Sequence, residues 1–476
     1  MLDNESYFKT DQFVQLLNQY EEAVQQGNPI YMDADDLADI ADYYQYNDRY
    51  EEAERTIDLA FEYNPDAVGP LLYRAREAMS KKDYDTAREY ADHIVAVDQQ
   101  EGFYLQGEIM INEGRLEEAD TFFMEKMKDI MLDELSDYVY DVATILSDYK
   151  AYDKAIMWIG RSKGDNSDEF KELMARTLFG LGKYKDSERI FNELIDHNPY
   201  SIQYWNALAT AQYMNEDYHA AITSSEYAIA IDPHDAESLL HKANSLYNLG
   251  NYESAQTYFE RYTEVMPDDE YGYLHQGTCL INLEKLPEAL KKLQRAEELA
   301  SAHEGSPCLP DICQELAFVY GEMKMPESAL YYLDKTLDLD CDHVNIEVIR
   351  GHILLQNNRS KEAQTAFKEA LRLSNNSSKV MLRVIVSLFE NHFVSSTYML
   401  LKTFLSHVDD DWKDGYSYMA LCCMVMKKKD EFLENLKIAV EKNPKEARSV
   451  LGNVFPEGMD PQDYYEYISN QLMTEE

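Results

Sequence analysis

The sequence has little glycine and proline and no long apolar run. Its 476 residues include 18 Gly and 13 Pro, and few such helix breakers favour helices over sheet-rich or disordered structure. No run of about 18 apolar residues occurs, so we expect no membrane-spanning helix. The first residues, Met1 to Tyr7, carry neither a basic stretch nor an apolar core. We therefore expect no secretion signal and a cytoplasmic location.

Basic residues are half as frequent as acidic ones. There are 44 Lys and Arg against 89 Asp and Glu, a formal net charge of −45. Binding to phosphate groups needs a basic face, which argues against nucleic acid and against an acidic membrane surface as partners. Residues 1–60 carry 15 acidic and 3 basic side chains, whereas residues 376–450 carry 10 and 11. This asymmetry could steer a basic partner to the N-terminal half; the alternative is that the acidic residues only keep a long chain soluble.

Cysteine is sparse and shows no disulfide framework. With no export signal, the six cysteines should be reduced thiols. Cys308, Cys313, Cys341, His303 and His343 gather in one region and are possible soft metal ligands. No C-x2-C pair is present, so we expect neither a metal site nor a cofactor. Phosphate-loop, H-E-x-x-H and G-x-S-x-G motifs are also missing from the sequence, and we expect no enzymatic activity.

A small residue recurs along the chain at almost fixed intervals. Successive marks are 32 to 36 residues apart, except for one interval of 40. A period near 34 indicates a solenoid of stacked helix pairs. The marks are Ala53, Ala87, Ala119, Ala155, Ser187, Ala221, Ala255, Ala289, Ala329, Ala363, Thr397 and Phe432.

The residues around each mark predict two helices and a break. In the unit that begins at Ile202, Trp205, Leu208 and Ala209 share one helix face. A polar turn follows, and Pro233 ends the second helix. Tyrosine is abundant, with 37 residues, and several begin a second helix, where we expect them to face the core. These are Tyr50, Tyr84, Tyr152, Tyr184, Tyr218 and Tyr252.

The pattern W-x2-L-(G/A), followed by Ala, Phe, Ala and Pro, resembles the tetratricopeptide repeat. The resemblance covers about residues 34–445 and is best in residues 202–300. It implies an all-α, right-handed α-α superhelical solenoid of about twelve helix-turn-helix repeats, with capping helices at its ends. Matching positions include Trp205, Leu208, Ala209, Ala221, Ala228, Pro233, Ala243, Ala255, Phe259, Pro267, Gly277, Ala289, Gly351, Ala363 and Phe367.

The expected organisation follows from the repeat boundaries. Two marks, Thr397 and Phe432, are bulkier than the rest, which puts close helix packing there in doubt. The interval of 40 comes from an insertion that either separates two stacks or forms a longer turn. The expected parts are a capping helix in 1–33, the first part of the array in 34–300, an insertion loop in 301–310, a second, degenerate part in 311–445 and a capping segment in 446–476.

The resemblance also implies that positions 2, 5, 9, 12 and 13 of each first helix line a concave groove. In residues 202–303 these positions supply amide, hydroxyl and aromatic groups, which suit an extended peptide. None of them is Lys or Arg, so we expect no clamp for an acidic C-terminal carboxylate. A merely solvated face is the alternative. The candidate partner-binding residues are Gln203, Asn206, Thr210, Tyr213, Asn244, Tyr247, Tyr271 and Thr278.

The sequence thus favours a non-enzymatic interaction scaffold that binds a protein or an extended peptide in this groove. The partner should be basic, or at least not acidic. Two alternatives stay open: a structural protein that self-associates or spaces other subunits, and an enzyme with an unrecognised site. The sequence does not fix the oligomeric state.

The close helix crossing at Ala255 gives a first prediction. Ala255→Glu would overpack the crossing and bury an unpaired carboxylate, so it should destabilise the protein by about 3 kcal/mol or more. Thermal unfolding followed by circular dichroism at the helix signal checks this. An unchanged midpoint would show that the repeat register is wrong.

Overall fold

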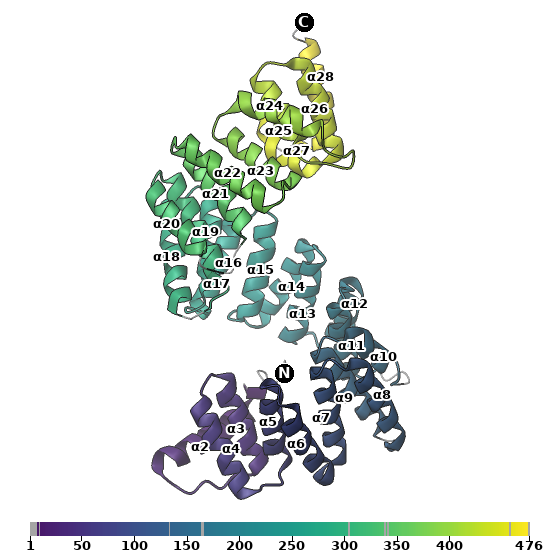
Figure 1. The fold of residues 1–476 in the computed structure, drawn as a ribbon. Coiled ribbons are helices and arrows are strands. Elements are labelled where there is room, and N and C mark those ends of the chain that lie inside the picture. Colours follow the sequence, from purple (N-terminus) through teal and green to yellow (C-terminus); the bar gives the residue numbers. More distant parts are fainter. Residues whose placement is uncertain are drawn as a thin grey trace. The chain divides into compact units, whose positions relative to one another are not determined.

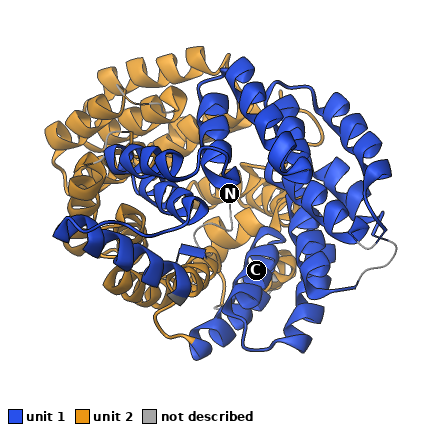
Figure 2. Ribbon diagram, turned by 90° about the horizontal axis from the view of Figure 1, so that it is seen from below, with its two compact units in different colours: residues 1–231 blue, residues 232–476 orange. Residues whose placement is uncertain are grey.

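The computed structural model describes residues 7–8, 10–132, 134–162, 166–302, 305–337, 339, 342–456 and 458–474. Every regular element in these residues is a helix (Figure 1). The chain divides into two compact units, residues 1–231 and 232–476 (Figure 2). This boundary differs from the insertion at 301–310.

Unit 1 contains six helix pairs after one leading helix. Its elements are α2 Asp11–Gln26, α3 Ala34–Tyr46, α4 Tyr50–Tyr63, α5 Val68–Ser80, α6 Tyr84–Val97, α7 Gln99–Asn112, α8 Leu116–Lys126, η1 Met127–Asp129, α9 Leu135–Asp148, α10 Tyr152–Ile159, α11 Asp168–Gly180, α12 Tyr184–His197, α13 Ile202–Met214 and α14 Tyr218–Ile231.

Unit 2 contains six further pairs and a C-terminal segment. Its elements are α15 Ala236–Asn248, α16 Tyr252–Val265, α17 Glu270–Asn282, α18 Leu286–Ala302, α19 Leu309–Glu322, α20 Pro326–Leu337, α21 His343–Gln356, α22 Ser360–Leu373, α23 Ser378–Glu390, α24 Val394–Leu405, α25 Tyr416–Val425, α26 Lys429–Lys442, α27 Pro444–Leu451, η2 Gly452–Val454, η3 Pro461–Asp463 and α28 Tyr464–Thr474.

The two helices of each pair are joined by the same turn. One residue of the turn has positive φ, and the next residue donates its backbone N–H to a carbonyl five residues earlier, as from Asn251 to Leu246 at 2.9 Å. This is a typical helix C-cap. Twelve described turns share it, so the predicted number of helix pairs is confirmed. The positive-φ residues are Asp48, Lys82, Gly114, Lys150, Gly182, Glu216, Gly250, Glu284, Lys324, Asn358, His392 and Lys427.

All twelve marked residues are buried. Ten of them are Ala or Ser with at most 1% of their surface exposed. Thr397 is fully buried and donates its hydroxyl to the carbonyl of Phe393 at 3.0 Å. Phe432 is 5% exposed and lies in a cluster with Met419 and Leu436. The doubt about packing in the last two pairs was therefore unfounded, since each bulkier residue has a place in the core.

Some first helices carry glycine where a side chain of the second helix approaches closely. A Cβ atom at Gly351 would lie 2.3 Å from Cε1 of Phe367, and a Cβ atom at Gly277 would lie 2.6 Å from Cγ of Leu293. Both distances are well inside van der Waals contact. The helices of these pairs can therefore cross only because the side chain is missing.

The tyrosines that begin second helices lie at the margin of the core and are not fully enclosed in it. Tyr50 is 63% exposed, and the other five are half-buried. Tyr218 and Tyr252 instead pack against an aromatic ring at the end of the preceding helix, with ring centroids 5.4 Å from Tyr213 and 5.3 Å from Tyr247. Tyr84 does pack against a core cluster, as expected. For Tyr50 the expectation was wrong, because the first turn of the second helix lies at the edge of the pair.

Each end of the array has further helical structure. In α2, Phe13 is fully buried and packs with residues of α3, and the Tyr20 hydroxyl lies 2.8 Å from that of Thr56. At the other end Asp460 caps a short 3-10 helix at Pro461, and the Phe455 and Tyr464 rings stack at 3.9 Å. These elements lie within residues 1–33 and 446–476, for which capping segments are expected from the sequence.

The insertion is bridged by one hydrophobic cluster. Helix α18 extends to Ala302 and α19 begins at Leu309, and Leu293 and Ile312 belong to the same cluster. His303 and Glu304, which were part of the predicted loop, lie outside the described residues.

The glycine contacts give a second prediction. Gly351→Ala should destabilise the protein by about 1–2 kcal/mol, because overpacking against Phe367 outweighs the better helix propensity of alanine. The urea midpoint measures the change. Gly452→Ala is the control, since a Cβ atom there would meet only the Tyr464 hydroxyl at 3.9 Å. The control should stabilise the protein slightly, because alanine has the better helix propensity. If Gly351→Ala stabilises it in the same way, the contact between Gly351 and Phe367 leaves room for a methyl group.

Candidate functional site

The four predicted residues of unit 1 lie on α13. Gln203 is exposed, and Thr210 and Tyr213 are half-buried. Asn206, however, has only 3% of its surface exposed. The expectation that its side chain points into an open groove was therefore wrong, because this position is almost fully buried.

The four predicted residues of unit 2 come together on α15 and α17. The Tyr271 hydroxyl donates to Oδ1 of Asn244 at 3.4 Å. The His275 ring lies between the tyrosines, with centroids 4.1 Å from Tyr271 and 6.2 Å from Tyr247. Thr278 is only 8% exposed, so its side chain packs within this cluster and is little accessible to a binding partner.

His275 is the residue of this cluster that the sequence did not indicate. Its burial lowers the pKa to about 4. Its Nδ1 atom is buried and has no hydrogen-bond partner among the described residues. The imidazole is therefore neutral at neutral pH and contributes mainly a flat aromatic surface.

Glu315 on α19 adds a carboxylate next to this cluster. It has no hydrogen bond or ion pair within the described part of the chain. Burial, together with a smaller contribution from the charge of Asp311, raises its pKa to about 7. The Glu315 carboxylate also contributes to the raised pKa of Tyr247, whose main cause is burial.

A groove follows on the next first helices of unit 2. Ala317, Gly351 and Ile385 occupy position 8 of α19, α21 and α23. Position 9 of these helices is therefore Phe318, His352 and Val386. Position 5 of α21 and α23 is Val348 and Leu382. These side chains line one open cavity of about 380 Å³, which we call the first-helix groove. Its apolar lining consists of Phe318, Val348, Ile349, Leu382, Val386 and Tyr418.

Sequence reasoning missed this groove because it ended at residue 303, where the interval of 40 interrupts the period. Within α19, α21 and α23 the register is regular. The small or apolar residue at position 8 of each helix identifies positions 5 and 9, which line the first-helix groove. The signal was therefore present in the sequence.

The polar side chains around the first-helix groove differ between its two ends. At one end Arg383 donates to Oδ1 of Asn345. At the other, Nδ1 of His352 lies 3.6 Å from a carboxylate oxygen of Glu390, and Gln356 donates its amide to Glu322. Both glutamates are exposed. The groove thus combines an apolar centre with one cationic and one acidic end.

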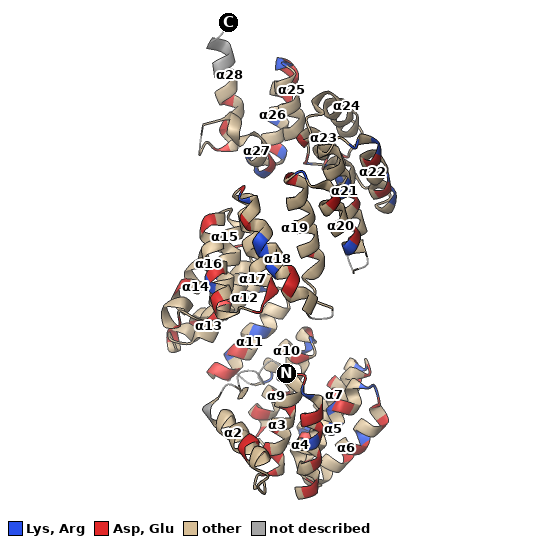
Figure 3. Ribbon diagram, turned by 90° about the vertical axis from the view of Figure 1, so that its left-hand side faces the viewer, with Lys and Arg blue, Asp and Glu red and all other residues tan. Residues whose placement is uncertain are grey.

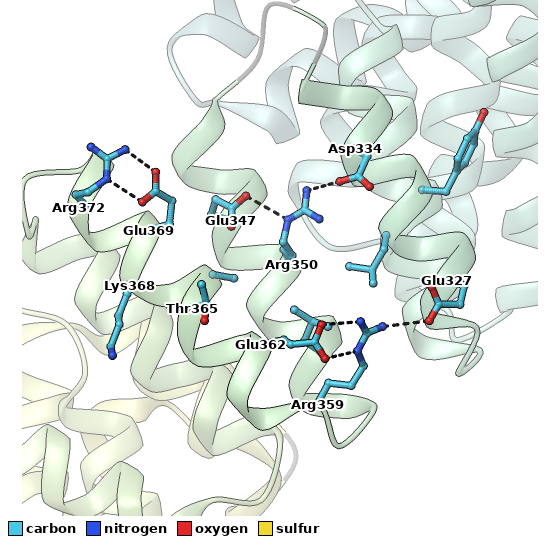
Figure 4. Close-up of a pocket in the computed structure, with 14 residues that line it drawn as sticks. Glu327, Asp334, Glu347, Arg350, Arg359, Glu362, Thr365, Lys368, Glu369 and Arg372 are labelled. Atoms are coloured by element: carbon cyan, nitrogen blue, oxygen red, sulfur yellow. Dashed lines mark hydrogen bonds and ion pairs between the residues drawn. The ribbon is translucent and has the colours of Figure 1, made fainter.

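A second cavity, of about 900 Å³, lies over α20, α21 and α22 (Figure 4). We call it the second-helix groove. Arg350 pairs with Asp334 at 2.9 Å, and Arg359 pairs with Glu362 at 2.7 Å and with Glu327 at 3.1 Å. Its arginines are therefore already satisfied by carboxylates of the same surface, and an added ligand would have to displace them.

The first helices of unit 1 present charge at the equivalent position 9. Asp42, Arg76 and Glu108 occupy it on α3, α5 and α7. Burial raises the pKa of Asp42 to about 6 although the charge of Arg76 lowers it. Burial raises the pKa of Glu108 as well, and Arg76 again opposes the shift. Acidic residues also outnumber basic ones on α2 to α6 (Figure 3).

Within the described ranges no three His, Cys, Asp or Glu side chains are arranged to hold a metal ion. Of the expected ligand group, His303 and Cys341 lie outside those ranges. Cys279, Cys308, Cys313, Cys422 and Cys423 are free thiols. As for membrane insertion, the described helices include none with both the length and the apolar character to cross a bilayer.

Comparison with known sequences agrees with the repeat. The tetratricopeptide repeat profile matches residues 38–102, 173–236 and 348–377. Residues 214–296 match the profile of anaphase-promoting complex, cyclosome, subunit 3. No curated protein sequence is similar enough to give a match.

Solved structures with similar folds were also found. Yeast Tom70 is 13% identical, with 92% of this chain and 96% of Tom70 covered and a TM-score of 0.43. A tetratricopeptide repeat protein from Parabacteroides merdae is 14% identical, with 53% and 97% covered and a TM-score of 0.40. YrrB, described as a TPR protein with an unusual peptide-binding site, is 20% identical, with 41% and 95% covered and a TM-score of 0.33.

The twelve helix pairs with their common turn define an all-α tandem-repeat protein. The profile matches identify tetratricopeptide repeats in residues 38–102, 173–236 and 348–377 of this array. This fold supports a role as a protein-interaction scaffold in general.

Glu315 gives a third prediction. A carboxyl whose pKa is raised on folding binds more protons in the folded state, so its contribution to stability falls as pH rises from about 4.5 to 7. Glu315→Gln should therefore raise the free energy of unfolding at pH 8 by on the order of 2 kcal/mol and change it little at pH 5. Urea unfolding at both pH values measures this.

The matched control is Glu264→Gln, which removes an exposed carboxylate from α16. It should have the same small effect at both pH values. An equal effect of Glu315→Gln at pH 5 and pH 8 would contradict the raised pKa.

Proposed function

We propose that this protein is a non-enzymatic scaffold that binds an extended segment of a partner protein along the first helices of unit 2. The first-helix groove is the observation that carries the proposal. Phe318, Val386 and Tyr418 are half-buried there and come from three different helices. An apolar side chain from a partner would complete their burial.

The size of the groove suits an anchor of this kind. A volume of about 380 Å³ can take one or two large side chains. Removing about 100 Å² of apolar surface from water stabilises a complex by roughly 2.5 kcal/mol. A few such central contacts usually dominate the affinity of a protein interface.

The amide and hydroxyl groups on α15 and α17 would hold the backbone of the same segment. Asn244, Tyr247 and Tyr271 offer donors and acceptors beside a flat aromatic surface. An extended peptide has free backbone N–H and C=O groups, and such side chains can pair with them. Gln203, Thr210 and Tyr213 on α13 would provide similar contacts in unit 1. Tetratricopeptide repeat proteins are generally scaffolds and not enzymes, which agrees with this assignment.

The charge of the chain favours partners that are not acidic. A net charge of −45 attracts basic segments at long range. Such steering acts on the association rate and weakens with salt, because the field decays over about 8 Å at physiological ionic strength. A cytoplasmic location, expected from the sequence, is part of this proposal.

Self-association is the second candidate, and α24 favours it. Met399 is 63% exposed and Leu400 is 42% exposed on this helix. Light scattering over a concentration series separates the two functions. A molar mass that stays at 55.3 kDa leaves binding of another protein as the function of the array.

Panning with random peptides gives the fourth prediction. A displayed library of peptides of about 12 residues, which span roughly 40 Å when extended, is selected on the immobilised full-length chain. Selected peptides should carry a large apolar residue. Val386→Asp should weaken their binding by about 10- to 100-fold, because the anchor loses its apolar contact.

Thr365→Glu is the control, since it adds the same charge in the second-helix groove, where Thr365 is exposed. Its affinity should equal that of the wild type, and circular dichroism should show both variants folded. Loss of binding in Thr365→Glu but not in Val386→Asp would assign the site to the second-helix groove.

A further inference from the structure

The acidic end of the first-helix groove has no cation of its own. Glu322 ends α19 and Glu390 ends α23, and neither forms an ion pair with a Lys or Arg in the described part of the chain. Gln356 donates to Glu322. Among the described residues, the ion-pair partner of Glu390 is His352, whose Nδ1 lies 3.6 Å from the carboxylate.

His352 does not neutralise these carboxylates. Its burial lowers its pKa, although Glu322 opposes the shift. The amide of Asn391 lies 3.4 Å from Nδ1 of His352. The end of the groove therefore places two glutamate side chains around an imidazole whose pKa is lowered.

Three helices end at this place, which adds to the negative potential. The last residues of α19, α21 and α23 are Glu322, Gln356 and Glu390. The C-terminus of a helix carries a partial negative charge from its free carbonyl groups. Cations are stabilised near such ends, so the backbone and the two side chains favour the same kind of ligand.

The apolar part of the groove lies directly beside this acidic end. Phe318 is one turn before Glu322 on α19, and Val386 is one turn before Glu390 on α23. Side chains four residues apart in a helix are neighbours on the same face. A segment that inserts an apolar side chain between Phe318 and Val386 therefore places its adjacent residues next to the carboxylates.

We propose that the segment bound in the first-helix groove presents a Lys or Arg side chain to Glu322 and Glu390, next to the apolar side chain that it inserts between Phe318 and Val386. This rests on the proposed function and names the chemistry of the partner. An acidic segment would meet like charge at this end of the groove.

Acid should weaken this contact. The groups that face it are Glu322 on α19, His352 on α21, Glu390 on α23 and Tyr418 on α25. Burial and the charge of Glu322 raise the pKa of Glu390, and burial, Glu390 and Glu446 raise the pKa of Tyr418 to about 12. As pH falls, Glu390 loses its charge and His352 gains one. Both changes disfavour a bound cation.

The fifth prediction uses the peptides selected on the wild-type chain. These should carry Lys or Arg within a few residues of the apolar anchor. Replacing that cation in the peptide by Gln should weaken binding to the wild type about fivefold, the usual range for an exposed ion pair. The same replacement should have no effect on Glu322→Gln/Glu390→Gln, and in the wild type the cation-dependent part should shrink as the pH is lowered.

Glu264→Gln/Glu288→Gln is the matched control, because it removes two exposed carboxylates from the second helices α16 and α18. It should keep the fivefold cation effect. The proposal is overturned if wild-type peptides show no preference for Lys or Arg, or if the fivefold effect persists in Glu322→Gln/Glu390→Gln. Binding that is insensitive to Val386→Asp would instead overturn the proposed function.

Discussion

The close crossing of the two helices in each pair is the constraint on which the rest of the structure depends. The turn between the two helices contains one residue in the left-handed conformation. The buried residue that marks each repeat lies five positions after it, in the second helix, where the helices cross. Because the same turn recurs in all twelve pairs, the same positions of successive first helices face the same way within a unit. A single residue of slippage in one turn would remove Phe318, Val348 or Val386 from their common groove.

The sequence period was enough to predict the helix pairs and several of their ends, because it records this crossing directly. Pro233 follows α14 and Asp460 caps the C-terminal segment, as their positions indicated. Burial was harder to predict. A register gives the direction of a side chain, whereas burial also depends on the size of its neighbours. For this reason Asn206 is buried although its register position faces the groove, and Tyr50 is exposed at the edge of its pair.

The candidate site was predictable in part for the same reason. Asn244, Tyr247, Tyr271 and Thr278 share one register and lie together, but His275 was invisible because it stands between register positions. The first-helix groove was missed because groove positions were assigned only in residues 202–303, before the interval of 40. Part of the extra length is absorbed in α18, which is 17 residues long. The register inside the later first helices is therefore undisturbed.

The two units carry different chemistry at equivalent positions, and the difference bears on how a scaffold selects a partner. On α3, α5 and α7 of unit 1, position 9 holds Asp42, Arg76 and Glu108. On α19, α21 and α23 of unit 2, it holds Phe318, His352 and Val386. Exposed charges contribute little affinity but act over distance and reject partners of like charge. Apolar contacts contribute most of the affinity but discriminate poorly by themselves. In the proposed site a carboxylate lies one turn from the apolar residues of the groove, so both effects act on the same short segment of a partner. A segment that has the apolar side chain but no cation, or the cation but no apolar side chain, is then expected to bind more weakly.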